Sequence, residues 1–339
     1  MASAHLGRQS ILFEKKPSIL SYASVVGKKE KDGPLGSYFD LTDEDTSFGQ
    51  KTWEKAENRM QQLALSAALR KPDLTNADVD VIFSGDLLNQ CIGSSFCLRG
   101  TGIPVLGLYG ACSTMAESLL LAGAMVNAGY ADLAAALTSS HFASSERQYR
   151  NPLAYGGQRT PTAQWTVTGA GCVLVRREGP GPYLHAATIG SIQDWGIKDP
   201  NNMGAAMAPA AYHTLSAHFR DLKLSPTDYD LIVTGDLGSV GKQIVIDLFA
   251  KDGVDIASRY DDCGCLIYDA KKQDVHAGGS GCGCSASVLC SYLMHLFAQK
   301  KIKKLLFCGT GALLSPTSTN QGESVPGVCH AVSIFAERN

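Results

Sequence analysis

The fold is decided by the stretch Tyr109-Gly110-Ala111-Cys112-Ser113-Thr114-Met115-Ala116-Glu117-Ser118. The apolar run from Val105 to Tyr109 leads into it and predicts a buried strand. Small and apolar residues from Met115 to Ala128 follow and predict a buried helix that Gly129 ends. Cys112 therefore lies at a strand-to-helix turn, at or just before the first helical residue.

The position of Cys112 allows two interpretations. Unpaired N–H groups and the positive end of the helix dipole stabilise negative charge at such a turn. A cysteine there can be a reactive thiolate, and the same turn can bind a carboxylate. Alternatively, Cys112 is a small apolar residue of the core. The context favours a functional site.

The composition is that of a globular protein with a large core. The chain has 339 residues, 45% of them apolar and 18% charged, which suits one large domain or two fused units. A net charge of −2 creates no overall field toward nucleic acid or an anionic membrane. There is no run of 18 apolar residues, and Met1–Gln9 does not resemble a signal peptide. The 11 cysteines cannot all pair, so we expect reduced thiols, a soluble protein of a cytosolic-type compartment, and no membrane span of its own.

Strand and helix patterns alternate along the chain, as in an α/β protein. The predicted strands, besides the one before Cys112, are Ser10–Phe13, Ser18–Val26, Val79–Ser84, Ala131–Leu137, Gly169–Arg176 and Tyr183–Ile189, and the predicted helices are Thr52–Lys71, Leu88–Leu98 and Asn202–Asp221. A charged surface loop is expected over Lys28–Gly36, and a long loop covering the site over Arg147–Thr168.

The pattern of the first half occurs a second time. The segment around Gly235-Asp236 repeats the one around Gly85-Asp86, 150 residues later, and Cys284-Ser285 repeats Cys112-Ser113 at an offset of 172. A repeat of this length indicates a duplicated βα half-domain with mixed sheets. The helices after Cys112 and Cys284 are then expected side by side in the centre.

These features resemble the thiolase superfamily. The resemblance rests on the duplicated half, the Ala111-Cys112-Ser113 turn before a buried helix, and a late loop, Gly309-Thr310-Gly311-Ala312. It implies a five-layered αβαβα fold, a homodimer, and Cys112 in the nucleophile's place. The two thiolase-like halves would be residues 1–178 and 179–339, intertwined in one globular unit.

A second resemblance is more specific. Ordered blocks resemble the stage V sporulation protein AD family of spore-forming bacteria, and they are Gly85–Gln90, Gly107–Thr114, Thr138–His141, Thr168–Gly171, Lys198–Pro200, Met207–Ala211 and Gly278–Cys282. The resemblance implies binding of dipicolinate (pyridine-2,6-dicarboxylate) and a part in its uptake, as the calcium complex, into the developing spore. It also implies a peripheral place at the spore inner membrane, with membrane partners from the same spoVA operon, and leaves open a role in release during germination. It implies no resident cofactor; calcium would arrive with dipicolinate.

The usual catalytic histidines of thiolase-like enzymes are missing from their expected positions. The stretch Ala277–Gly281 has glycine at the expected thiolase position, with His276 nearby but out of register, and the ketosynthase position reads Thr234-Gly235-Asp236. A cysteine nucleophile needs a base, so we predict a binding protein and not an enzyme. The alternative is an active thiolase- or ketosynthase-type acyltransferase in which the helix alone activates Cys112.

Dipicolinate is flat and doubly anionic, so its site needs hydrogen-bond donors or cations and flat walls. The predicted ligand-binding residues are Cys112, Ser113, Asp86, Ser139, Ser140, His141, Lys198, Asp236, Ser280 and Cys282. Arg147 and Arg159 are further candidate cations, although most loop cations are solvated surface charges. His141 could equally be a structural histidine.

Asp86 and Asp236 occupy the same point of the two repeats, each after a glycine at a strand end. Two carboxylates near a pseudo-twofold axis could hold the Ca²⁺ of a calcium–dipicolinate complex. The preferred interpretation is that each caps the helix that follows it.

Two Cys-x-Cys motifs, Cys263-Gly264-Cys265 and Cys282-Gly283-Cys284, raise the possibility of a metal site. Four thiolates suit zinc or an iron–sulfur cluster. One intervening residue is fewer than such sites usually have, so no metal site is predicted.

Overall fold

The computed structural model describes residues 4–149 and 159–338. Its strands are β1 (His5–Leu6), β2 (Ser10–Leu12), β3 (Ser18–Val26), β4 (Leu41–Thr42), β5 (Val81–Gly85), β6 (Val105–Gly107), β7 (Leu133–Ser140), β8 (Trp165–Thr166), β9 (Gly169–Arg176), β10 (Tyr183–Thr188), β11 (Leu231–Thr234), β12 (Tyr260–Asp262), β13 (Gly279–Ser280), β14 (Lys304–Ala312) and β15 (Gly327–Phe335). Its helices are α1 (Lys28–Lys31), α2 (Trp53–Arg70), α3 (Ile92–Leu98), α4 (Thr114–Ala128), α5 (Phe142–Tyr149), α6 (Met203–Leu222), α7 (Gly238–Lys251), α8 (Cys263–Leu266), α9 (Cys282–Val288), α10 (Met294–Ala298) and α11 (Pro316–Asn320).

The main strands follow one order, β12-β11-β14-β15-β10-β3-β9-β7-β5-β6. Each half of this order has the same pattern. In the first, β3, β9 and β7 pair antiparallel and β7, β5 and β6 pair parallel; in the second, β10, β15 and β14 pair antiparallel and β14, β11 and β12 pair parallel. The two halves are joined where Tyr183 of β10 faces Ser18 of β3.

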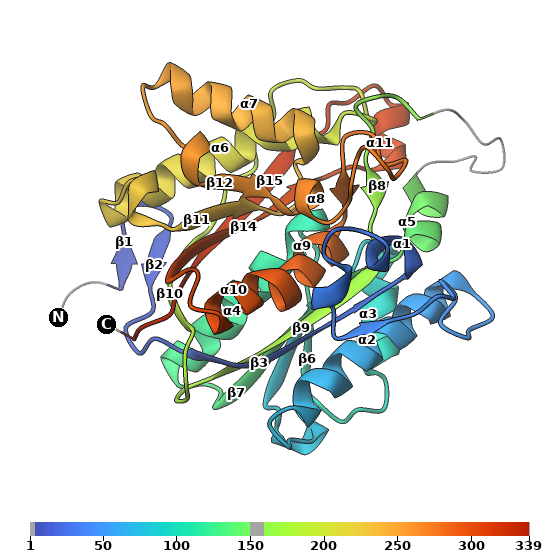
Figure 1. Ribbon diagram of the computed structural model, residues 1–339, viewed down its shortest axis with the longest axis vertical. Helices are drawn as coiled ribbons and strands as arrows, with labels where there is room; N and C mark the ends of the chain where they lie inside the picture. Colours follow the sequence, from blue (N-terminus) through green and yellow to red (C-terminus); the bar gives the residue numbers. More distant parts are fainter. Residues whose placement is uncertain (1–3, 150–158, 339) are drawn as a thin grey trace.

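Helices lie between the two halves of the sheet and outside both of them (Figure 1). In the middle layer, α4 contacts β5 and β7 on one side and β14 and β15 on the other, with α9 beside it. The outer layers are α2 and α3 on the first half and α6 and α7 on the second. The predicted five-layered αβαβα fold, with the two central helices side by side, is therefore confirmed.

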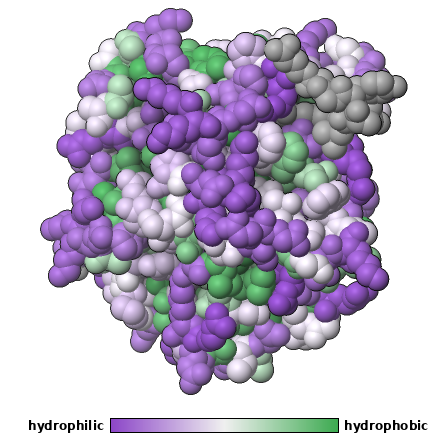
Figure 2. All heavy atoms as spheres, turned by 45° about the vertical axis from the view of Figure 1, so that its right-hand side comes forward, coloured by the Kyte–Doolittle hydropathy of each residue, from purple (hydrophilic) through white to green (hydrophobic). Residues whose placement is uncertain are grey.

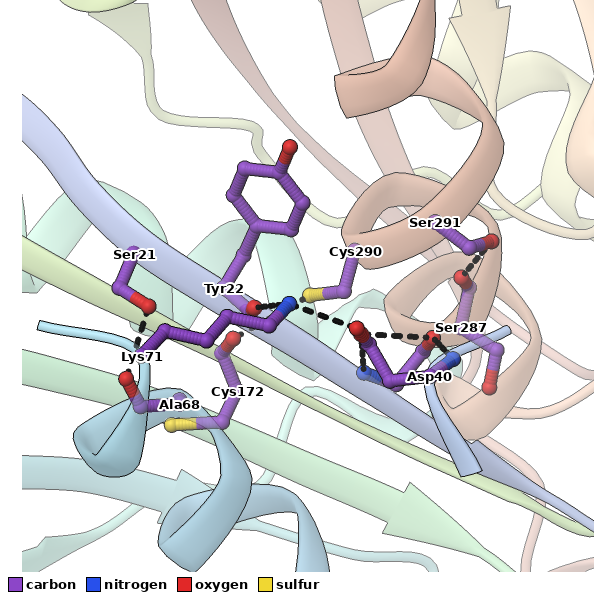
Figure 3. Close-up of polar contacts among 10 residues, drawn as sticks. Ser21, Tyr22, Asp40, Ala68, Lys71, Cys172, Ser287, Cys290 and Ser291 are labelled. Atoms are coloured by element: carbon purple, nitrogen blue, oxygen red, sulfur yellow. Dashed lines mark hydrogen bonds and ion pairs between the residues drawn. The ribbon is translucent and has the colours of Figure 1, made fainter. Parts of the chain in front are cut away.

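Side chains bond the layers to one another (Figure 3). The Lys71 ammonium, at the end of α2, donates to the Tyr22 carbonyl of β3 at 2.5 Å and lies 2.7 Å from an Asp40 carboxylate oxygen. The Ser21 hydroxyl of β3 donates to Ala68 of α2 at 2.7 Å, and the thiol of Cys290 in the middle layer donates to Cys172 of β9. The sheet at β3 and β9 is thus bonded to the helical layers on both of its faces.

The duplication extends to hydrogen bonds that the sequence pattern did not reveal. Thr75 and Asp78 form a capping box before β5, and Ser225 and Asp228 form the same box before β11. Two residues later, the carboxylates of Asp80 and Asp230 each accept two backbone N–H groups from the start of the neighbouring parallel strand. These pairs all keep the offset of 150, which supports a duplicated half-domain. The division at residues 178 and 179 stays a prediction.

Four local predictions were wrong. The strand before Cys112 is shorter than predicted and exposed, because β6 is the edge of the sheet. The long loop begins after Tyr149, where α5 ends, and 150–158 lie outside the described residues. The stretch Lys28–Gly36 contains α1, which buries Glu30. Residues 309–312, predicted as a loop, form the end of β14.

Glycines allow the sheet and the central helices to approach closely. A Cβ added to Gly171 of β9 would lie 2.5 Å from the backbone oxygen of Ala286 in α9. The backbones would have to separate, because neither group can rotate away.

Within the described residues, no helix combines the length and the apolar character that crossing a bilayer requires.

Because a Cβ at position 171 would meet the backbone of α9, replacing Gly171 with Ala should destabilise the protein by about 1–3 kcal/mol, the usual cost of overpacking a core. Urea unfolding followed by circular dichroism would measure this free energy. The control is Ser66→Ala on the exposed side of α2, which should change stability by less than about 0.5 kcal/mol. Equal stability of the two variants would contradict the packing argument.

Candidate functional site

The turn that carries Cys112 has an unusual backbone. Ala111 adopts a left-handed conformation, with φ of 50°, in the 3-10 turn Ala111–Ser113. The Ser113 hydroxyl donates to the Gly110 carbonyl at 2.7 Å, and the Thr114 hydroxyl donates to the Ala111 carbonyl at 2.6 Å. These bonds hold a conformation that a residue with a Cβ adopts only at a cost.

Strand β14 of the second half packs directly on this turn. A Cβ at Gly311 would lie 2.3 Å from the Gly110 carbonyl oxygen, and a Cβ at Gly309 would lie 2.7 Å from the Ser113 carbonyl oxygen. Only glycine permits these approaches without a backbone shift. Both halves of the chain therefore shape the surroundings of Cys112.

A small pocket opens above Cys112. Tyr109 and Tyr149 form aromatic walls, and their hydroxyls are hydrogen-bonded at 2.7 Å. The remaining lining residues come from both halves and are Leu87, Ala111, Ser145, Glu146, Thr166, Met203, Ser280, Ala312 and Leu314. The mixture of apolar walls with few polar groups is typical of sites that bind a small organic ligand.

The Cys112 thiol lies close to the buried carboxylate of Asp236, and the two groups interact electrostatically. The same carboxylate accepts the Gly281 N–H at 2.8 Å and the Thr310 hydroxyl at 2.8 Å. Burial raises the pKa of Asp236 to about 6. Burial, and then the charge of Asp236, raise the pKa of Cys112 well above its usual value, so the thiol stays protonated at neutral pH.

The equivalent aspartates of the two repeats have different partners. The Asp86 carboxylate accepts the Leu88 N–H at 2.9 Å and the Ser94 N–H and hydroxyl at 2.7 Å each. In the second half, Asp262 accepts the N–H groups of Leu237 and Gly238 at the start of α7. Asp262 thus takes the capping role that was predicted for Asp236, and Asp236 bonds to Gly281 and Thr310 beside Cys112.

The structure brings four of the ten predicted site residues together. Cys112 and Ser280 line the pocket, Asp236 contacts the thiol, and Cys282 packs against Cys112 and Leu87. The Cys282 thiol donates to the Ser139 carbonyl at 2.9 Å.

The other six have partners elsewhere or face solvent. The hydroxyls of Ser113 and Ser140 donate to the backbone, and that of Ser139 donates to the buried Glu57 carboxylate at 2.8 Å. His141 contacts the Thr46 carbonyl and stacks on Trp53, and Asp86 makes the bonds given above. Lys198 is exposed on the segment before α6. Of the two loop cations, Arg147 pairs with Glu54, and Arg159 lies 2.9 Å from Asp274.

Several pocket residues were not predicted from the sequence. Ser145, Glu146 and Tyr149 lie on α5, a segment expected to be partly loop, and Met203 and Leu314 come from distant parts of the chain. No local motif marks them. By contrast, the sequence blocks that carry the two resemblances contain Leu87, Tyr109, Ala111 and Ala312.

No three metal-ligating side chains among the described residues gather around one point. This includes the thiols of the two Cys-x-Cys motifs. The structure thus gives no support to the metal alternative.

Comparison with known proteins assigns the family. Residues 7–335 match the family described as stage V sporulation protein AD (SpoVAD). The chain is 45% identical over 326 residues to stage V sporulation protein AD of Bacillus subtilis (strain 168), which covers 96% of each chain. The chain belongs to the stage V sporulation protein AD family. It is a sporulation protein with a thiolase-like fold.

Solved structures agree on the fold. The 3-oxoacyl-[acyl-carrier-protein] synthase III of Aquifex aeolicus VF5 is 14% identical, with a TM-score of 0.57 over 94% of this chain and 99% of its own. The human mitochondrial 3-ketoacyl-CoA thiolase, solved with CoA, is 14% identical, with a TM-score of 0.59 over 99% of this chain and 100% of its own. At this identity the likeness concerns the fold alone.

The contact between Cys112 and Asp236 predicts how fast the thiol is alkylated. Replacing Asp236 with Asn removes a negative charge that opposes the thiolate, so the rate with iodoacetamide at pH 8 should rise about 3- to 10-fold. Mass spectrometry of the Cys112 peptide over time would measure it.

The matched control is Asp86→Asn, the same position of the first repeat, which should leave the Cys112 rate unchanged. A slower reaction in folded Asp236→Asn would contradict the argument and would mean that Asp236 acts as a base.

Proposed function

We propose that this protein binds dipicolinate in the Cys112 pocket and does not catalyse a reaction. The observation that carries the proposal is the pocket itself, with aromatic walls and with a protonated thiol beside a carboxylate at its floor. Tyr109 and Tyr149 supply flat surfaces for the pyridine ring. The hydroxyl of Ser280 supplies a polar contact for a carboxylate.

Charge favours the calcium complex over the free dianion. The described lining residues include Glu146 but no lysine or arginine, and Asp236 lies below Cys112. A bare dianion would meet carboxyl groups, whereas Ca²⁺ cancels its charge and prefers oxygen ligands. We infer that calcium enters the pocket with dipicolinate and that the protein has no resident cofactor.

The surroundings of the thiol support binding over catalysis. A thiol becomes a nucleophile as the thiolate, and burial and Asp236 both oppose that form. An imidazole at this position would become positive on taking the proton and would stabilise the thiolate. A carboxylate cannot do so.

The alternative is an acyltransferase that uses Cys112. It is favoured by one observation, the thiol that opens to the pocket beside a hydrogen-bond acceptor, in a fold shared with a thiolase and a ketoacyl synthase. Incubation with acetyl-CoA and detection of released CoA would test it, and turnover that Cys112→Ser abolishes would establish it.

We further propose a homodimer formed through β6. This edge strand exposes Val105, Leu106 and, just after it, Tyr109, at 41%, 51% and 46% of their surfaces. An apolar edge strand is an aggregation hazard unless it is covered. Antiparallel pairing with β6 of a second copy would cover it.

In the cell, we propose that the protein lies at the surface of the spore inner membrane with membrane-embedded partners from the spoVA operon. It would deliver calcium–dipicolinate to them during spore development and could take part in its release during germination. This rests on the family assignment and on the pocket.

Calorimetry with dipicolinate, with and without Ca²⁺, tests the ligand. We expect one saturable site per chain, bound more tightly with Ca²⁺ because calcium offsets the pocket's carboxyl groups. Cys112→Trp, whose side chain fills the pocket, should abolish binding.

Leu314→Trp at the pocket rim is a second blocking variant in case Cys112→Trp does not fold. Leu313→Trp, beside it but outside the pocket, is the control and should bind normally. A folded wild-type protein that binds neither dipicolinate nor its calcium complex would remove the proposal.

Analytical ultracentrifugation tests the dimer. Leu106→Arg places a charge on the exposed edge strand and should convert the dimer to a monomer, because an unpaired charge in an apolar interface is costly. Tyr130→Arg, at a site that is 78% exposed after α4, should remain a dimer. A monomeric wild-type protein would refute the proposal.

A further inference from the structure

A groove between α2 and α3, on the outer layer of the first half, is lined by basic side chains. Lys55 and Arg59 come from α2, and Arg99 follows the end of α3. Lys51 precedes α2 and lies four residues before Lys55 in the chain. All four are exposed, and none forms an ion pair within the described part of the chain. We call these four cations, together with Phe96, the basic groove.

The acidic residues of α2 do not neutralise the basic groove. The helix contains two, Glu54 and Glu57. Glu54 pairs with Arg147 of α5, and the Glu57 carboxylate is buried and accepts the hydroxyls of Ser139 and Ser144 at 2.8 Å each. The exposed face of this helix is therefore positive, although the whole chain carries −2.

An aromatic ring lies among these charges. Phe96 of α3 is 46% exposed, and the Arg99 guanidinium sits 5.0 Å from its ring centre. Ile92, one turn earlier on α3, is 41% exposed. Figure 2, in which the right-hand side of Figure 1 comes forward, shows hydrophobic surface interspersed with hydrophilic surface over this part of the molecule.

We infer that the basic groove binds an anionic phospholipid surface. Cations beside an exposed aromatic ring match the surface of a bilayer. The lysine and arginine side chains would meet the phosphate groups, and the Phe96 ring would enter the boundary between the headgroups and the acyl chains. A second copy of this chain fits poorly, because a twofold interface would bring the same positive patch against itself. The overall charge of −2 does not prevent binding to an anionic membrane. Salt screens charges that lie more than about 10 Å from the groove.

The inference has a consequence for the pocket. Helix α5 lines the pocket with Ser145, Glu146 and Tyr149 and is tied to α2 by the pair between Arg147 and Glu54. A membrane under α2 would therefore lie next to one wall of the ligand site.

Cosedimentation of the full chain with vesicles tests the inference. Vesicles of phosphatidylglycerol and phosphatidylcholine should bind the protein, and pure phosphatidylcholine vesicles should not. The variant Lys55→Glu/Arg59→Glu/Arg99→Glu should bind at least about 100-fold more weakly, since each cation near an anionic bilayer contributes about fivefold. Phe96→Ser should weaken vesicle binding by the same factor at low and at high salt, because salt does not screen an apolar contact.

The control is Lys251→Glu/Lys271→Glu/Lys301→Glu, which makes the same change in net charge at exposed sites elsewhere and should still bind. Thermal unfolding would show that each variant is folded. Equal binding to both kinds of vesicle, no binding by the wild type, or equal loss in the control would overturn the inference. A change in oligomeric state in the triple variant, with vesicle binding unchanged, would assign the groove to a protein contact instead.

Discussion

The close approach of β14 to the Cys112 turn is the constraint on which the site depends. Gly311 lies so near Gly110 that a single added carbon would be 2.3 Å from its carbonyl oxygen. This contact joins the two halves of the chain and supports the left-handed backbone of Ala111. Since the turn belongs to the first half and the strand to the second, neither half could build the pocket alone.

The duplication explains most of the architecture. The site lies where the hydrogen bonds of the two repeats differ. Asp80 and Asp230 keep the same bonds after duplication, as do the capping boxes before them. Asp86 and Asp236 do not, because Asp262 supplies acceptors for the start of α7 in the second half. Asp236 instead accepts the Gly281 N–H and the Thr310 hydroxyl beside the Cys112 thiol. Burial raises the pKa of Asp236 to about 6 and that of Asp262 to about 7. The charge of Asp236 also raises the pKa of Asp262, because the two buried carboxylates lie close together.

The sequence was sufficient for features that are local or periodic. The helix of α2, the strand β3 and the left-handed end of α4 at Gly129 follow from spacing and glycine chemistry. It was insufficient wherever a tertiary contact decides. The apolar run before Cys112 fits a buried strand and an exposed edge strand equally well, so the pattern alone does not distinguish them. Ser139 and Ser140 have the residue type of a ligand site, yet Glu57 and the backbone take their hydroxyls. The α5 residues of the pocket belong to no motif, because only folding brings them to Cys112.

The chemistry at Cys112 turns on which acceptor stands beside it. A neutral imidazole gains a positive charge with the proton, so the resulting ion pair stabilises the thiolate. A carboxylate that takes the proton becomes neutral and cannot form an ion pair with the thiolate. A carboxylate that stays ionised repels the thiolate, so neither state favours the nucleophile. The sulfur instead lies at the pocket floor beside Asp236, where Cys282 packs against it. Both burial and the neighbouring negative charge thus oppose the thiolate at Cys112.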